Sequence, residues 1–509
     1  MIFMGIKLNF ILFVFIILIC IIYSKFSTAN SNENLFQTLA DNISVDAIAV
    51  YTIEDTTASG DIYYSFFGHK PKYPISENNI SEFKWWTLIN ENTQSAPIPN
   101  PIMGDDDKPY IAFSREGFAV AVWGNRYTVR TVPCGDPPVQ VPVERGDILF
   151  SVFDGSIWTP ATIAIPGMDD IQLKDPSIAI DNNGNGVIVY SKETTARAAG
   201  CPGDVSIEVN YGTFNGSDKT FAFGGILDPA YTLPFPGYST GPEVAFTSEN
   251  LSSGLTKQKA VAAWWSPDGV ASRMCPGNPP YPYSIPVYWP KKAIWDGGIF
   301  TSIDYIPNKP VYPLDLSNNL SILPSHKMGV SSDQFGNAIV TWGIRRQFGD
   351  PCVLPNPPNE EEMYFARWNY SRWSPTAKEF TEVPDFTFPF SMDLAFLPSN
   401  HAIALYRFRN APGMYYIRYA VENNGAWLPR GDVDSATGLS PAITSSAHNI
   451  TLAIWIEGAT LMWSRFNNSH IYTGSWTPKT FLADLSVGGG GGGEQPELAA
   501  HTGSPTMPH

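Results

Sequence analysis

A small residue followed about eleven positions later by an aromatic one recurs along this chain, with a turn rich in Gly, Asn and Asp between two apolar runs. The copies run from Ala40 to Tyr51, Ala112 to Trp123, Ala179 to Tyr190, Ala395 to Tyr406 and Thr444 to Trp455. Two looser copies carry an insertion between Ala245 and Trp264, or extra residues before Trp342. Seven copies at a period of roughly 50 to 75 residues indicate an array of supersecondary units.

Each copy predicts four short strands. In the third copy, residues 176–180 and 187–190 are two apolar runs, and residues 181–185 between them tolerate positive φ, so a hairpin is expected. A second hairpin follows in each copy, marked by a recurring Trp-x-Pro at Trp158, Trp373, Trp427 and Trp476. The 44 Pro and 42 Gly residues interrupt the chain too often for long helices.

Four-stranded units repeated seven times predict an all-β fold, a seven-bladed β-propeller of four-stranded antiparallel blades. The alternative is a row of β-sandwiches, but a sandwich needs about seven strands in each unit. We expect blades near residues 35–103, 106–170, 173–235, 239–316, 322–386, 389–436 and 439–487. Residues 488–509 form a Gly-rich tail in which Pro496–Ala499 looks like the opening of another copy, either a closing strand or the start of a truncated eighth blade.

Residues 1–29 predict a signal peptide or an N-terminal anchor. Leu8 to Tyr23 is uncharged and mostly apolar, and Ser27, Thr28 and Ala29 then offer small residues for cleavage. We therefore expect an exported protein, extracellular or at the cell surface, with membrane anchoring through residues 8–23 if the segment is retained. The net charge of −16 and the lack of a basic run argue against nucleic acid as a partner.

The repeat itself resembles a known group. Its first half, Pro-x-hydrophobic-Ala, is clearest at residues 176–190, and its second half, Gly-Asn-Ala-hydrophobic-Val-hydrophobic-Trp, at residues 336–342. The pattern is similar to the blade repeats of exported bacterial and archaeal β-propellers of sialidase-like (BNR-type) architecture. The resemblance implies blades and says little of activity. Ser331, Ser332 and Asp333 carry part of the sialidase Asp-box but sit at the inner turn, which puts sialidase chemistry in doubt.

Four cysteines lie at similar places, ten or eleven residues after an aromatic residue of the repeat: Cys134, Cys201, Cys275 and Cys352. In an exported protein they predict two disulfides. Three connectivities are open, and neighbouring blades favour Cys134 with Cys201 and Cys275 with Cys352. Free thiols or a metal site are the alternatives, although zinc sites place their cysteines in close pairs.

The same connections, between the second and third strands of blades 2 to 5, carry arginines and aromatic residues. The candidates for ligand binding are Arg130, Arg197, Arg273, Arg345, Tyr283 and Trp289. A guanidinium group can donate two parallel hydrogen bonds to a carboxylate or a sulfate, and aromatic rings can stack on sugars. The alternatives are solvated charges and loop packing.

No residue is identified as catalytic. The acidic runs Asp105–Asp107 and Glu360–Glu362 could supply the two facing carboxylates of a glycosidase, but such runs are more often solvated turns. The turn at Asp181 opens like a calcium loop, yet Lys192 stands where a bidentate Glu belongs, so a hairpin turn is expected. We therefore expect no cofactor and no metal.

These features predict an exported, non-enzymatic recognition or surface-structural β-propeller that binds glycan or protein at the cell surface through the loops of blades 2 to 5. The alternative is a sialidase-like glycoside hydrolase or lyase acting on acidic glycans. Eight Asn-x-Ser/Thr sequences matter in addition if the host glycosylates exported proteins: they begin at Asn42, Asn79, Asn215, Asn250, Asn319, Asn369, Asn449 and Asn467.

Overall fold

The structure is a computed structural model of the chain. It describes residues 45–54, 60–69, 83–86, 96–114, 117–155, 157–198, 201–232, 241–250, 256–275, 281–307, 322–324, 328–333, 335–347, 359–369, 372–374, 378–379, 392–397, 401–411, 414–423, 426–434, 438–446, 450–466, 474–485 and 496–500. The chain divides into two units, residues 1–45 with 67–84 and residues 46–66 with 85–509. In the first unit only Val45, residues 67–69, Phe83 and Lys84 are described, as parts of strands.

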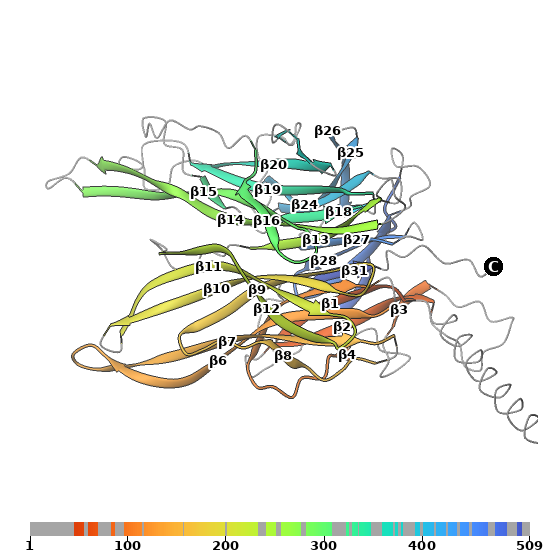
Figure 1. Cartoon of the computed structure of the whole chain (residues 1–509). Coiled ribbons are helices and arrows are strands. Elements are labelled where there is room, and N and C mark those ends of the chain that lie inside the picture. Colours follow the sequence, from red (N-terminus) through yellow and green to blue (C-terminus); the bar gives the residue numbers. More distant parts are fainter. Residues whose placement is uncertain are drawn as a thin grey trace, which may run out of the picture. The chain divides into compact units, whose positions relative to one another are not determined.

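Every element in the described residues is a β-strand, which confirms the all-β class (Figure 1). The strands fall into seven successive groups. The first three groups are β1 (Val45–Glu54), β2 (Gly60–His69), β3 (Phe83–Trp86) and β4 (Ala96–Pro97); β5 (Asp105–Phe113), β6 (Ala119–Cys134), β7 (Val139–Phe153) and β8 (Thr162–Ile165); and β9 (Ile171–Ile180), β10 (Gly186–Ala198), β11 (Cys201–Asn215) and β12 (Thr220–Thr232).

The fourth group is β13 (Glu243–Asn250), β14 (Thr256–Cys275), β15 (Tyr281–Trp295) and β16 (Phe300–Tyr305). The fifth is β17 (Ile322–Pro324), β18 (Gly329–Ser332), β19 (Asn337–Gln347), β20 (Asn359–Asn369), β21 (Arg372–Trp373) and β22 (Lys378–Glu379). The last two are β23 (Met392–Phe396), β24 (Ala402–Ala411), β25 (Met414–Asn423) and β26 (Ala426–Asp434); and β27 (Gly438–Ser445), β28 (Thr451–Glu457), β29 (Thr460–Phe466) and β30 (Thr480–Asp484). A final strand, β31, spans Glu497–Ala500.

Within each group the strands pair antiparallel, and five of the seven groups pair in chain order. In the first group β4 pairs with β2, and in the fifth both β17 and β18 pair with β19, while β21 and β22 pair with β20. The second and third groups share one sheet through a single parallel bridge between Gly146 and Gln172. The described residues contain no helix that is long and apolar enough to cross a membrane, and residues 8–23 lie outside them.

The last strand of the chain completes the first group. β31 pairs antiparallel with β1, so that Glu497 lies opposite Val50 and Leu498 opposite Ala49. The fourth group has the same arrangement within one hairpin, where Glu243 lies opposite Ala263. Ala499 therefore takes the place of the small residue beside β1. Ala40, which was predicted to hold that place, lies outside the described residues.

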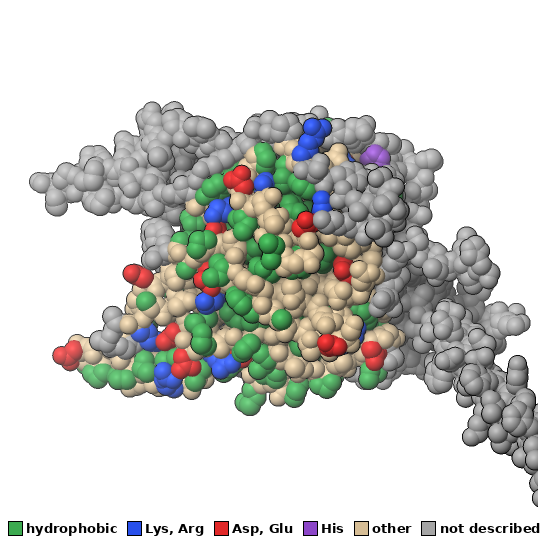
Figure 2. Space-filling model, viewed as in Figure 1, with side chains coloured by type: hydrophobic (Ala, Val, Ile, Leu, Met, Phe, Trp, Pro, Cys, Tyr) green, Lys and Arg blue, Asp and Glu red, His purple; other side chains and the backbone are tan. Residues whose placement is uncertain are grey.

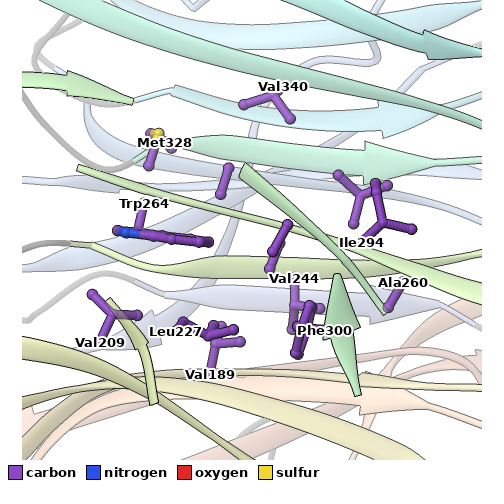
Figure 3. Packing of buried hydrophobic residues seen from close by; sticks show 14 of the residues in the cluster. Val189, Val209, Leu227, Val244, Ala260, Trp264, Ile294, Phe300, Met328 and Val340 are labelled. Carbon is purple, nitrogen blue, oxygen red and sulfur yellow. The ribbon is translucent and has the colours of Figure 1, made fainter. Parts of the chain in front are cut away.

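Neighbouring groups meet through one strand each, which is β18 in the fifth group, β31 in the first group and the first strand in the others. β5 contacts β9, and contacts then link β9 to β13, β13 to β18, β18 to β23, β23 to β27, β27 to β31 and β31 back to β5. The apolar core lies between consecutive groups. Its largest cluster joins the third, fourth and fifth groups, with Trp264 between Val209 and Met328 (Figure 3). Other clusters join the second group to the third, the fifth to the sixth and the sixth to the seventh.

The polar residues between the two apolar runs of the repeat form turns, as predicted. Asp181 Oδ1 accepts hydrogen bonds from the backbone N–H groups of Asn183 and Asn185, both at 2.8 Å, and closes the hairpin between β9 and β10. Asp333 does the same for β18 and β19. An Asp at this position satisfies the turn's own amides, which explains its recurrence without a metal.

The residue after Trp in the second hairpin also has a defined task. Thr159 Oγ1 accepts a hydrogen bond from the N–H of Val152 at 2.9 Å, and Thr477 Oγ1 accepts one from Arg465 at 3.0 Å. Each threonine hydroxyl accepts a hydrogen bond that a backbone carbonyl would otherwise accept, at the point where the following Pro ends the regular strand pairing. Trp158 itself is buried against Phe153.

Candidate functional site

The connections between second and third strands are long strand pairs, not the loops expected from the sequence. β6 and β7 pair from Ala119 opposite Phe153 out to Cys134 opposite Val139, although β8 pairs only with residues 148–150 of β7. β14 and β15 likewise pair out to Cys275 opposite Tyr281. Frequent β-branched residues, as in Thr128–Val132 and Val139–Val143, favour this extension. We call these pairs the extended hairpins.

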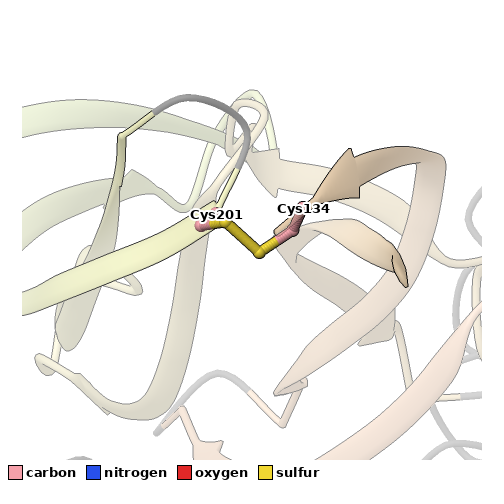
Figure 4. Close-up of a disulfide and its surroundings, with 2 residues drawn as sticks. All are labelled: Cys134 and Cys201. Atoms are coloured by element: carbon pink, nitrogen blue, oxygen red, sulfur yellow. A yellow bond between two sulfur atoms is a disulfide. The ribbon is translucent and has the colours of Figure 1, made fainter. Parts of the chain in front are cut away.

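A disulfide joins the tips of two extended hairpins (Figure 4). Cys134 ends β6 and Cys201 begins β11, and their Cα atoms lie 4.7 Å apart across a sequence separation of 67 residues. The predicted pairing of these neighbouring groups is confirmed. Cys275 ends β14 and Cys352 lies outside the described residues, so the second disulfide stays a prediction.

Two of the candidate arginines clamp the connection between β8 and β9. Arg197 Nε donates to both oxygens of Asp170 at 2.7 Å, and its Nη2 donates to the carbonyl of Pro142 at 2.6 Å. Arg130 forms an ion pair with the neighbouring Asp169. The structure therefore brings Arg130 and Arg197 together through adjacent acids, so both guanidinium groups already bind carboxylates of this chain.

The other candidates lie on the fourth and fifth groups. Arg273 on β14 is opposite Tyr283 on β15, and Arg345 on β19 is opposite Glu361 on β20. The side chains of these residues lie outside the described part. The acidic run Glu360–Glu362 thus belongs to a strand, with Arg346 opposite Glu360, an arrangement that favours opposite-charge pairs.

The expectation that Trp289 is an exposed aromatic platform is wrong. Trp289 is 1% exposed, donates from Nε1 to the carbonyl of Ile306 at 3.1 Å, and packs edge-on against Trp342 with ring centroids 5.9 Å apart. A buried indole whose N–H is satisfied belongs to the core. The sequence could not show this because Ile306 and Trp342 come from distant parts of the chain.

A polar cluster that sequence reasoning missed lies at the base of the first extended hairpin. Asp147 is buried and accepts hydrogen bonds from the Tyr127 hydroxyl at 3.1 Å, Arg145 Nε at 3.0 Å and the Gly167 N–H at 2.6 Å. Burial and then the charge of Asp147 raise the pKa of Tyr127, and the hydrogen bond to Asp147 raises the pKa of Arg145. Asp147 thus fixes the hairpin base.

Charge is balanced on this part of the surface. Lys174 pairs with Glu193 and Lys192 with Glu208, each across neighbouring strands. On the face drawn in Figure 2, acidic and basic side chains are interspersed. The extended hairpins therefore lie next to both acidic and basic side chains, and two of them are joined by a disulfide.

A cavity of about 200 Å³ is lined by residues of β5, β9, β13, β18, β23, β27 and β31. Residues at one repeat position link three of the groups to the next. Ser177 Oγ accepts from the Val244 N–H at 3.2 Å and Glu243 Oε2 from the Val330 N–H at 3.0 Å. Asp393 Oδ2 likewise accepts from the Ile443 N–H at 2.8 Å. The residue at the second position of the Pro-x-hydrophobic-Ala pattern thus forms the hydrogen bond between neighbouring groups.

One residue of the acidic run Asp105–Asp107 is buried. Asp106 accepts hydrogen bonds from Asn100 Nδ2 at 2.6 Å and Asn125 Nδ2 at 2.7 Å. Burial raises the pKa of Asp106 to about 7, although these hydrogen bonds lower it. Its neighbour Asp105 pairs with Arg126 at 3.3 Å. Asp106 therefore anchors the connection from β4 and is not a solvated turn residue.

No protein-family model matches the sequence, and no curated protein matches it. Among solved structures, the polysaccharide lyase Uly1 has 7% identity and a TM-score of 0.41, with 87% of this chain and 89% of that chain covered. An ulvan lyase has 10% identity and a TM-score of 0.38, with 90% of each chain covered. The sialidase of Trypanosoma rangeli, solved with the inhibitor DANA, has 12% identity and a TM-score of 0.35, with 81% of this chain and 58% of that chain covered.

Proposed function

We propose that this chain is an exported, non-enzymatic recognition or surface-structural protein. Its seven strand groups are the blades of a closed β-propeller, and it binds glycan or protein through the extended hairpins of blades 2 to 5. The contacts that run from β5 through one strand of each group to β31 and back support closure. The disulfide supports passage through an oxidising compartment.

The observation that carries the proposal is the bracing of two extended hairpins against each other. Cys134 and Cys201 join their tips, while Arg197, next to the tip of the second hairpin, pairs with Asp170 and donates to the Pro142 carbonyl of the first. A connection between two strands needs neither device, and fixing a surface before binding reduces the entropy lost on binding.

The acids of the cavity support the non-enzymatic interpretation. Glu243 and Asp393 each accept a hydrogen bond from the backbone of the next group. Each bond joins neighbouring groups, a structural role that accounts for these two carboxylates without catalysis.

Binding should be tested with the purified full chain against immobilised acidic glycans, neutral glycans and surface proteins. A trimmed variant replaces residues 129–143 and 195–205 with two-residue Asn-Gly turns, which removes the two braced hairpins beyond their sheets. We expect it to lose binding. The matched control C134S/C201S lacks the disulfide but keeps both hairpins, and it should retain measurable binding. Equal binding by the trimmed and unaltered chains would place recognition elsewhere.

One observation favours a glycoside hydrolase or lyase as the second candidate. Glu243, Asp393 and Glu497 all line the same cavity, and glycoside hydrolysis needs two carboxylates on either side of a bond. Incubation with acidic polysaccharides, followed by assays for new reducing ends and unsaturated products, tests it. Turnover that disappears in both E243Q and D393N would replace the recognition proposal with the enzyme.

A further inference from the structure

The two ends of each strand group differ. In an antiparallel group, the first–second and third–fourth connections lie at one end, which we call the turn end. The second–third connection and the link to the next group lie at the other, the hairpin end, where the Cys134–Cys201 disulfide is found. Ser177, Glu243 and Asp393 make the same bond to the next group, so three pairs of neighbouring groups meet at the same repeat position.

The Asn-x-Ser/Thr sequences that begin in described strands lie at the turn end. Asn215 and Asn369 end the third strands β11 and β20, and Asn250 ends the first strand β13. Outside the described residues, Asn449 follows β27 and Asn467 follows β29 in the sequence, and Asn319 falls in a link between groups.

Asn215 and Asn369 occupy equivalent and accessible positions. Both side chains are exposed, and each follows a buried aromatic residue, Phe214 or Trp368. Asn215 Oδ1 accepts the N–H of Ser217 at 2.9 Å, and its Nδ2 donates to Asp218 at 3.1 Å. This turn brings residue 217, which carries the required hydroxyl, back toward the Asn amide.

The same position in the second group is Asp154, followed by Gly155 and Ser156. Asp154 Oδ1 accepts the N–H of Ile157 at 2.9 Å, so the turn needs only an Asn or Asp side chain. The second group would therefore carry a glycan acceptor sequence if Asp154 were Asn. This gives a matched pair of turns, Asp154 against Asn215, on one sheet.

We propose that Asn215 and Asn369 are N-glycosylation sites, which places their N-linked glycans at the turn end and away from the extended hairpins. The donor is a lipid diphosphate-linked oligosaccharide. A bond forms between sugar C1 and the Asn Nδ2 atom, the C1–O bond to the diphosphate breaks, lipid diphosphate leaves, and the amide gives up one proton. Glycans at the turn end are far along the strands from the extended hairpins, so they shield one end without covering the other.

The test is secretion of the full chain from a eukaryotic cell that makes this donor, with site occupancy measured by mass spectrometry after enzymatic deglycosylation in heavy-oxygen water. We expect Asn215 and Asn369 to be occupied in most molecules. S217A keeps the Asn215 turn but should lose one glycan, N369Q should lose another, and D154N should gain one. Unmodified Asn215 and Asn369 in folded, secreted protein, or occupancy confined to Asn319, would overturn the proposal. Occupancy needs no ligand, so this result is independent of the binding test.

Discussion

The side chain of Glu243 hydrogen-bonds the backbone N–H of Val330 at 3.0 Å and so ties the fourth strand group to the fifth. Its other oxygen accepts the Tyr110 hydroxyl at 2.9 Å. Glu243 is 5% exposed, so both bonds are sheltered from water. The residue is a connector between groups that are far apart in sequence.

Replacing Glu243 should therefore lower the free energy of unfolding. E243A leaves the Val330 N–H without its acceptor, and we expect a loss of about 1 to 3 kcal/mol in denaturant titration. E243Q keeps an acceptor oxygen and should cost less. If E243A unfolds at the same denaturant concentration as the unaltered chain, the bond does not join the groups.

The aromatic residues of the repeat should be equally important. Trp342 is fully buried, stacks on Tyr364 at 6.0 Å and meets Trp289 edge-on. W342A should cost about 3 to 5 kcal/mol, because the cavity it leaves cannot close completely. W342F should cost less. Wild-type stability of W342A would show that the site is not packed as described.

Stability should fall with rising pH through the titration of Asp106. The folded-state pKa, about 7, lies above the ordinary value of 3.8, so the folded chain binds this proton more tightly than the unfolded chain. Its contribution to stability is complete below pH 3.8 and is lost as the pH rises from there to about 7. Relative to D106N, which cannot titrate, the unaltered chain should lose up to about 1.4 kcal/mol per pH unit in this window. Parallel pH profiles of the two proteins would contradict the assignment.

The disulfide should stabilise the chain mainly by restricting its unfolded state. Cys134 and Cys201 close a loop of 67 residues, for which chain entropy gives about 4 kcal/mol. C134S/C201S should unfold at a lower temperature than the unaltered chain. We also expect Cys275 and Cys352 to be joined, so the unfolded, unreduced mature chain should show no reactive thiol. Titration of two thiols would leave that second bridge unsupported.

The local features of this protein could be predicted from its sequence, because they depend on residues a few positions apart. Asp181 forms a hairpin turn as expected, and Cys134 pairs with Cys201 because the repeat places both at the same point of neighbouring groups. The burial of Trp289 and the hydrogen bonds of Asp147 were missed, because their partners come from strands whose packing no spacing reveals. The stub at Pro496–Ala499 could be identified from the sequence, but its partner could not, because the pairing of β31 with β1 joins the two ends of the described chain.

Closure by β31 is the central claim, and removing that strand tests it most directly. Hydrogen exchange and thermal unfolding should be compared for the full chain, a chain ending at residue 495 and a control ending at residue 500. The control keeps β31 and should match the full chain. The shorter chain leaves the edge of β1 unpaired, so we predict rapid exchange of the amides of residues 47–50 and a lower unfolding temperature. Unchanged exchange and stability after loss of β31 would show that the chain does not close through this strand.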